Sequence, residues 1–187
     1  VHEYGSERRV AEWLYILERR KKWVGKVLPA LLLGHAYHDN GDLTSALETL
    51  RRGIMERPDN AHQLFFYGDL LLESGEIESG IENLVLSIKL DKEKASLAGK
   101  LLAGYAERAI EEKDISKAEY LYRTAATLAP NDQWHKVHLG ELLEKQGQQA
   151  EAEALYRSVL LAAPESPYTA HLVDSLYHER NDIAGQL

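Results

Sequence analysis

Apolar positions along this chain recur at the spacing of α-helices. Between residues 27 and 60, two apolar series follow each other, one through Ala30, Leu33, Gly34 and Tyr37 and the next through Leu43, Ala46, Leu47, Leu50 and Ile54. Residues three or four positions apart lie on one face of a helix, so each series predicts a helix with one buried face. The residues between the series, Asp39-Asn40-Gly41-Asp42, are typical of a turn, because glycine adopts the positive φ at which a helix ends. The segment therefore predicts two antiparallel helices.

The same pattern recurs three more times along the chain, and the unequal intervals between its copies are the same for every column of residues. Helix backbones approach closely only where a facing side chain is small, and a large residue opposite fills the remaining space. We therefore expect the small residues to lie at contacts between helices. Two columns of small residues and two of large apolar residues recur at intervals of 34, 38 and 34 positions: Gly34, Gly68, Ala106 and Gly140; Ala46, Gly80, Ala118 and Ala152; Leu33, Tyr67, Tyr105 and Leu139; and Leu50, Leu84, Tyr122 and Tyr156. These intervals predict four helix pairs, at residues 27–60, 61–94, 95–132 and 133–166.

The junctions that follow the pairs carry helix-stopping residues. Pro58, Pro130 and Pro164 end the first, third and fourth pairs, because proline cannot continue a helix. Asp, Asn or Ser residues stand just after these prolines and can cap the next helix. Lys92 takes the place of proline after the second pair, so we expect a flexible joint around Asp91.

The third pair departs from the others in two ways. Its turn, Glu112-Lys113-Asp114, has no glycine, so we expect this turn to be less sharply specified. The pair is also longer by four residues, which is close to one helical turn of about 3.6 residues. We therefore expect the helix that begins near Lys94 to be about one turn longer than its counterparts.

This pattern resembles the tetratricopeptide repeat family, whose repeat of about 34 residues carries a Leu-Gly pair, an aromatic residue, an alanine, a second aromatic residue and a final proline. The last pair matches best, through Leu139-Gly140, Gly147, Ala152, Tyr156 and Pro164. The aromatic residue that usually follows the Leu-Gly pair is present only as Tyr37. The resemblance implies an all-α fold, a right-handed α-solenoid of antiparallel helix pairs that winds into a superhelix with a concave face.

Two further helices are expected at the ends of the chain. Residues 1–26 predict a packing helix, with Val10, Trp13, Leu14 and Leu17 on one face and Ser6 as its cap. Residues 167–187 predict a capping helix or a truncated fifth repeat, because Val173 and Tyr177 lie 34 positions after Leu139 and Leu143. Either end can instead continue into further repeats.

The charge of the chain is uneven and acidic overall. Residues 1–26 carry seven basic and four acidic side chains, net +3, whereas the remaining residues carry 15 basic and 26 acidic, net −11. The acidic body disfavours nucleic acid and anionic membranes as partners. No apolar run approaches the roughly 20 residues that a membrane helix requires. The basic cluster from Arg19 to Lys22 fits either a solvated helix end or contact with an acidic lipid surface.

Signatures of catalysis and of metal binding are weak in this sequence. It has no cysteine, and it lacks a Gly-rich phosphate loop, a nucleophile elbow and an HExxH motif. We therefore expect neither an enzyme nor a cofactor. Two histidine pairs, His35 with His38 and His135 with His138, have the spacing to chelate a metal from one helix face. Further ligands are hard to find, so we favour histidines that face solvent or line a groove.

The resemblance also implies which residues line the concave face. In tetratricopeptide proteins the first helix of each pair lines this face. The candidates for partner binding are Leu31, His35, His62, Phe65, Asp69, Glu73, Glu107, Trp134, Glu141, Tyr168 and His171, with His38, Lys100, Ala103 and Val137 beside them. Related domains clamp chaperone carboxylates with Lys, Asn and Arg side chains from these inner positions, whereas this chain offers Leu31, His35, Asp69 and Glu107, so we do not expect such a clamp. The groove is therefore expected to be acidic and aromatic.

Such a groove favours a protein-interaction scaffold that docks a peptide or helix of a partner. Its carboxylates favour a basic or amphipathic segment, with Phe65, Trp134 and Tyr168 as apolar anchors. The alternative for these rings is that they only cover neighbouring helices. A second hypothesis from the resemblance is a module of a bacterial exopolysaccharide synthesis or secretion machinery, contacting a modifying enzyme or a cationic polymer. Self-association, use of the convex surface, and a cytoplasmic, periplasmic or membrane-tethered location are left open.

Overall fold

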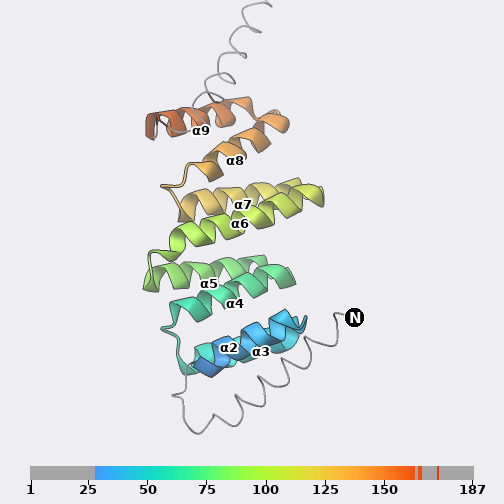
Figure 1. The fold of residues 1–187 in the computed structure, drawn as a ribbon. Coiled ribbons are helices and arrows are strands. Elements are labelled where there is room, and N and C mark those ends of the chain that lie inside the picture. Colours follow the sequence, from blue (N-terminus) through green and yellow to red (C-terminus); the bar gives the residue numbers. More distant parts are fainter. Residues whose placement is uncertain (1–27, 163, 166–171, 173–187) are drawn as a thin grey trace, which may run out of the picture. The chain divides into compact units, whose positions relative to one another are not determined.

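The computed structural model describes residues 28–162, 164, 165 and 172, and every regular element among them is an α-helix. The helices are α2 (Leu28–Asp39), α3 (Leu43–Glu56), α4 (Ala61–Ser74), α5 (Ile77–Leu90), α6 (Lys94–Glu111), α7 (Ile115–Leu128), α8 (Trp134–Lys145) and α9 (Gln149–Ala162) (Figure 1). The helices expected within residues 1–26 and 167–187 lie outside the described residues, as do Tyr168 and His171.

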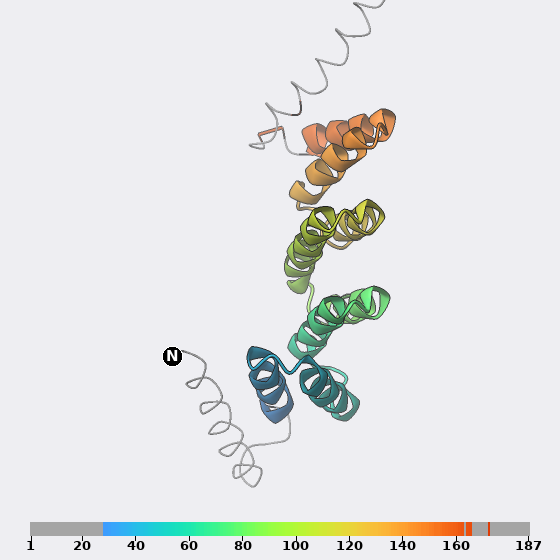
Figure 2. The same cartoon turned by 90° about the vertical axis from the view of Figure 1, so that its right-hand side faces the viewer.

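The chain divides into two compact units, one ending at Lys94 and the other beginning at Ala95. The first unit holds the pairs α2 with α3 and α4 with α5, and the second holds α6 with α7 and α8 with α9 (Figures 1 and 2). Helices within a pair run side by side in opposite directions. The prediction of an all-α chain built from antiparallel helix pairs is confirmed for the described residues.

The two columns of small residues are buried at helix contacts, as predicted. A Cβ atom on Gly68 of α4 would lie 2.9 Å from the carbonyl oxygen of Gly80 on α5. On Gly140 of α8 it would overlap the ring of Tyr156 on α9. These two pairs close because one helix presents no side chain at the point where the other presents backbone or a large ring.

Helix starts are specified by short polar side chains. The carboxylate or amide oxygens of Asp42, Asn60 and Asp114 accept hydrogen bonds, 3.0–3.1 Å long, from the backbone N–H groups three residues further on. These contacts satisfy amide groups that have no partner within the helix itself. Asp42 and Asp114 start the second helices of their pairs, and Asn60 starts α4.

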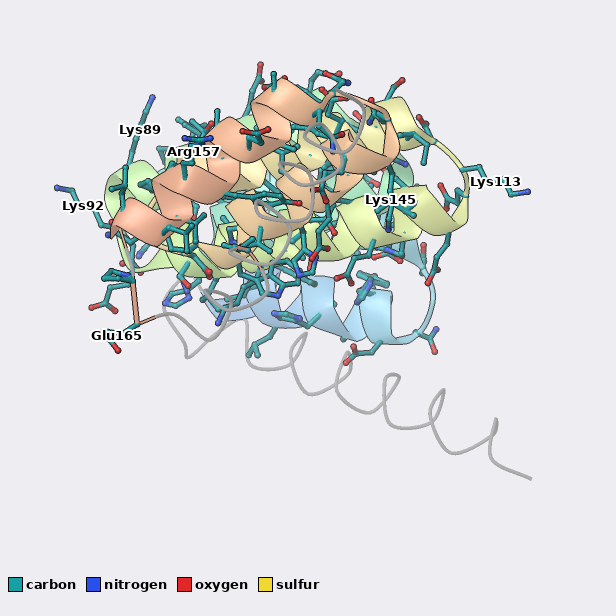
Figure 3. All side chains as sticks on the ribbon, turned by 90° about the horizontal axis from the view of Figure 1, so that it is seen from above. Lys89, Lys92, Lys113, Lys145, Arg157 and Glu165 are labelled. Carbon is teal, nitrogen blue, oxygen red and sulfur yellow. The ribbon has the colours of Figure 1, made fainter. Side chains whose placement is uncertain are left out.

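The third pair has the extra turn expected from its length. Helix α6 contains 18 residues, whereas α4 contains 14. The turn after α6 places Lys113 at φ 64°, close to the values of Gly41, Gly75 and Gly147, which are 77°, 90° and 75°. Lys113 therefore occupies the glycine position of the turn, with its side chain projecting away from the ribbon (Figure 3).

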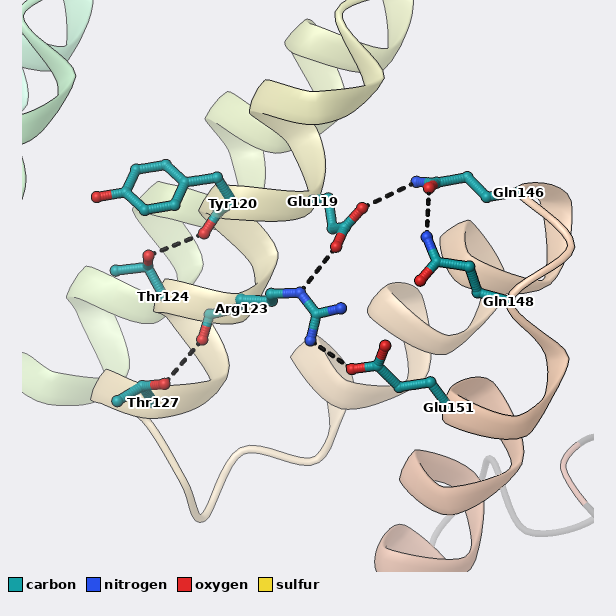
Figure 4. Close-up of polar contacts among 8 residues, drawn as sticks. All are labelled: Glu119, Tyr120, Arg123, Thr124, Thr127, Gln146, Gln148 and Glu151. Atoms are coloured by element: carbon teal, nitrogen blue, oxygen red, sulfur yellow. Dashed lines mark hydrogen bonds and ion pairs between the residues drawn. The ribbon is translucent and has the colours of Figure 1, made fainter.

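A polar network joins α7 to the pair α8–α9 (Figure 4). Arg123 donates from Nε to Glu119, at 2.9 Å, and from Nη1 to Glu151 of α9, at 2.6 Å. Gln146, at the end of α8, donates to the second oxygen of Glu119 at 3.2 Å, and Gln148 donates to Gln146 at 2.7 Å. The guanidinium thus links helices of two successive pairs within the second unit.

Candidate binding surfaces

The first candidate surface lies where α2 packs beside α4, and we call it the α2–α4 face. It consists of His35 and His38 from α2 and Phe66 and Glu73 from α4. The imidazole of His35 stacks on the ring of Phe66, with centroids 3.7 Å apart and an interplanar angle of 18°. His38 meets the same ring edge-on and places its Nε2 atom 2.9 Å from a carboxylate oxygen of Glu73. The face therefore combines aromatic rings with a carboxylate.

The charge of His35 is governed by its partial burial. Desolvation lowers the pKa of this imidazole, and the nearby Asp39 carboxylate opposes the shift. The ring is consequently uncharged at neutral pH, which suits its stacking on Phe66.

Other predicted residues of the first unit lie in different surroundings. His62 is exposed, and its Nδ1 atom is 2.9 Å from Lys94 Nζ, whose ammonium also lies 5.7 Å from the ring centroid of Phe65. Leu31 is half-buried and packs against the core, so it is less available for binding than expected. Asp69 is half-buried on α4.

The second candidate surface is a pocket formed by α6, α7 and α8, which we call the α6–α8 pocket. It has a volume of 310 Å³. Apolar lining comes from Ile110, Ile115, Tyr122 and Leu142, and polar lining from Glu107, His138, Glu141, Lys145 and Gln146. A neighbouring cavity of 520 Å³ is lined by Lys100, Gly104, Glu107, Asp132 and Trp134. Glu107 lines both cavities, so they adjoin.

Aromatic rings line one side of these cavities. The rings of Trp134 and His138 have centroids 4.0 Å apart, and His138 lies parallel to Tyr122 at 6.2 Å. His138 Nδ1 is 3.0 Å from a carboxylate oxygen of Glu141. Burial raises the pKa of Tyr122 to about 12, with further contributions from the negative charges of Glu107 and Glu141. The pocket therefore holds the carboxylates of Glu107 and Glu141, with the ammonium of Lys145, beside aromatic surfaces.

Three predicted positions are corrected by the structure. Ala103 and Val137 are buried, each with 1% exposure, so they face the core and not a groove. His135 is fully buried, so the expectation of a solvent-facing or groove-lining histidine is wrong for this residue. Its Nε2 atom would lie 2.6 Å from a Cβ on Gly99, which shows how tightly the imidazole packs against α6. Neighbouring residues of a helix point in different directions, so a shift of one position decides whether a side chain is buried.

The sequence interpretation missed Phe66 as a surface-forming residue, whereas His138 was expected to face solvent or line a groove and does line the α6–α8 pocket. Tyr122 belongs to a column of large apolar residues, and its exposure of 2% agrees with the packing role expected from that column. Phe66 and His138 occupy one repeat column, Leu32, Phe66, Gly104 and His138, with intervals of 34, 38 and 34 positions. This column was the available signal, and the contact with His35 shows that Phe66 and not Phe65 lies on the α2–α4 face.

The histidine pairs do not form a metal site in the part of the chain that the structure describes. No three His, Asp or Glu side chains converge there in a way that could hold a metal ion. His38 and His138 are each paired with a glutamate, and His35 is stacked on Phe66. None of the described helices is long and apolar enough to cross a membrane.

Comparison with known proteins supports the fold. Family models described as Tetratricopeptide repeat match residues 30–60 and 109–176. A crystal structure of MamA aligns at 18% identity with a TM-score of 0.54, covering 83% of this chain and 87% of that one. MamA 41-end from Desulfovibrio magneticus aligns at 17% identity and 0.52, with coverages of 88% and 93%.

A tetratricopeptide repeat protein from Parabacteroides merdae aligns at 18% identity with a TM-score of 0.51, covering 85% of this chain and 62% of that protein. A search of the curated proteins finds no match. At these identities the likeness concerns the fold alone. The predicted solenoid of helix pairs is confirmed by these matches.

Proposed function

Because this chain belongs to the tetratricopeptide repeat family, we propose that it is a non-catalytic scaffold that docks a basic or amphipathic segment of a partner protein. Members of this family generally serve as scaffolds for protein–protein interactions. The proposal adds the chemistry of the segment and the surfaces that bind it, which are the α2–α4 face and the α6–α8 pocket.

The observation that carries the proposal is the pairing of aromatic rings with carboxylates on both surfaces. Glu73 accompanies the stacked rings of His35 and Phe66, and Glu141 accompanies the rings of Trp134 and His138, which contact each other at an angle. Large rings usually contribute most of the binding energy of an interface, whereas complementary charges determine orientation and partner choice. A segment with apolar and basic side chains satisfies both requirements.

Affinity purification with the full chain, followed by mass spectrometry, tests this function. The test variant combines Trp134→Ala with Glu141→Gln, which removes one ring and one charge from the second surface. We expect this variant to lose the partners that the wild type captures. Glu107→Gln, which leaves no cavity in the core, is a second variant in case Trp134→Ala impairs folding.

The matched control combines Tyr120→Ala with Glu153→Gln. It also removes one ring and one carboxylate, but Tyr120 on α7 is 45% exposed and Glu153 forms a surface pair with Arg157 on α9. This control should retain the partners. If the control loses them and the test variant keeps them, a different surface binds and the proposed sites are wrong.

The exopolysaccharide hypothesis remains a prediction from the resemblance alone. No described residue favours it specifically, and the comparisons do not bear on it. Binding of a purified cationic polysaccharide to the full chain, measured by calorimetry, would support it.

A further inference from the structure

Gly104 differs from the other helical glycines of the described residues. At Gly34, Gly53, Gly68, Gly80, Gly99 and Gly140, an added Cβ atom would lie less than 3.0 Å from a neighbouring atom. At Gly104, no atom lies within 4 Å of the same position. The packing of this chain therefore does not require a glycine at residue 104.

A glycine without a packing role is unfavourable in a helix. It costs roughly 1 kcal/mol relative to alanine, because its backbone loses more freedom on folding. Gly104 lies inside the 18-residue helix α6, and it has no positive φ. The open space beside it is the cavity of 520 Å³ that Glu107, Asp132 and Trp134 also line.

The repeat shows what is missing at this position. Gly104 stands in the same column as Phe66 and His138, whose rings lie parallel to the rings of His35 and Tyr122. In the third pair the column has no ring, and the space that a ring would fill stays open beside Trp134. Glycine is also the residue that allows a ligand to approach a helix backbone closely.

We propose that a partner segment crosses α6 at Gly104 and inserts a basic side chain, arginine by preference, between Glu107 and Glu141. This inference rests on the proposed function and specifies the ligand of the second surface. Asp132 adds a third carboxylate beside Trp134, so the two cavities together are lined by three carboxylates and by the two ammonium groups of Lys100 and Lys145. An acidic segment would meet these carboxylates, so charge complementarity selects a basic one.

Arginine suits the site better than lysine for a geometric reason. A planar guanidinium stacks on an aromatic ring while its N–H groups donate to carboxylates. The half-buried ring of Trp134 and the carboxylates of Glu107 and Glu141 offer both kinds of contact. Burial is the main cause of the raised pKa of Tyr122, and the negative charges of Glu107 and Glu141 add to it, as expected of carboxylates close to this ring.

A selection from a display library of 12-residue peptides tests the inference with the full chain as target. We expect the enriched peptides to share an arginine or lysine, and substitution of that residue by alanine to weaken binding at least about tenfold. The key variant is Gly104→Phe, which restores the ring of the column and fills the cavity. It should weaken the same peptide at least about tenfold without lowering the melting temperature. Ala154→Phe, at an exposed position of α9, is the matched control and should leave affinity unchanged.

Three outcomes would overturn the inference. Enriched peptides could lack a basic residue, or they could bind Gly104→Phe as tightly as the wild type. The full chain could also dimerise, with Gly104→Phe producing monomers in sedimentation; the occupant would then be a second copy. The proposed function is judged separately, because partners lost in Trp134→Ala/Glu141→Gln but kept in Gly104→Phe would contradict this inference alone.

Discussion

At the scale of single residues, the space opposite a side chain decides what that residue contributes. Gly68 and Gly104 both lie within helices, yet the first faces the backbone of Gly80 and the second faces an open cavity. Lys113 contributes through its backbone conformation, since its φ of 64° is one that L-residues rarely adopt. The same residue type can therefore be required at one position and replaceable at another.

Replacing Gly68 by leucine should lower the free energy of unfolding by more than about 2 kcal/mol. The new side chain would push α4 away from α5, because the carbonyl oxygen of Gly80 cannot move without shifting a helix. Urea unfolding followed by circular dichroism measures the change. Gly104→Leu is the matched control and should not destabilise the protein, and equal losses in the two variants would contradict this assignment.

Replacing Lys113 by glycine should raise the free energy of unfolding by roughly 0.5–1 kcal/mol. Glycine adopts positive φ without the steric cost that lysine has there, although it loses more entropy on folding. Thermal unfolding of the two proteins provides the comparison. Lys113→Ala keeps the steric cost and should give no increase, whereas a lower melting temperature for Lys113→Gly would rule out this explanation.

The buried His135 should make stability depend on pH. Neither ring nitrogen has a hydrogen-bond partner among the described residues. Burial lowers the pKa of His135, an effect that Asp132 opposes and that His138 and Lys100 reinforce. The unfolded chain then binds a proton more readily than the folded one. Stability is therefore complete above a pH of about 6.5 and falls as the pH decreases below it.

Urea unfolding at pH 7.5 and pH 5 would measure this dependence, and His135→Gln should reduce it. One proton contributes at most about 1.4 kcal/mol per pH unit. His35, whose pKa is also lowered, contributes in the same direction, so His35→Gln serves as the comparison. If the free energy of unfolding decreased by the same amount between pH 7.5 and pH 5 in the wild type and in both variants, these two histidines would be excluded as the source of the pH dependence.

At the scale of helices, pairs are closed by small residues, and the two pairs of each unit are joined by side-chain contacts. The interaction of Arg123 on α7 with Glu151 on α9 is one such joint in the second unit. The guanidinium lowers the pKa of the Glu151 carboxyl by hydrogen bonding to it. Both side chains are partly exposed, which limits the stabilisation that their charges provide.

Removal of this ion pair should therefore have a modest effect. We expect a coupling energy of about 0.5–1 kcal/mol between Arg123→Met and Glu151→Gln in a double-mutant cycle, decreasing at high salt. Methionine retains the apolar stem of the arginine, so the cycle isolates the charge. The pair Arg157 and Glu153, which lies within α9, is the control and should show a smaller coupling energy.

At the scale of the whole molecule, the excess of negative charge should govern the encounter with a basic partner. Residues 27–187 carry a net charge of −11, so the association rate of an enriched basic peptide should fall as the salt concentration rises. Surface plasmon resonance at 50 and 300 mM NaCl would measure this rate. A peptide of the same length without charge should show no such change, and equal salt dependence of the two would contradict the argument.

Much of the fold could be predicted from the sequence, because contacts between helices require small and large residues to recur at regular intervals. Gly34, Gly68 and Gly140 recur at matching positions because each lets the two helices of its own pair approach closely. The length of the third pair predicts the extra turn of α6. Capping residues such as Asp42 and Asn60 can also be predicted from the sequence, because each accepts a hydrogen bond from a backbone N–H group only three positions further on.

The candidate surfaces depended on contacts between pairs, which a period does not specify. His35 meets Phe66, 31 positions away, and His135 is buried although His138, one turn further on, lines a pocket. A rotation of about 100° per residue separates a core position from a surface position, so an error of one residue exchanges Phe65 with Phe66. The packing of α6 against α7 and α8 decided where the pocket opens, because only the folded chain brings Glu107, Tyr122 and Glu141 together.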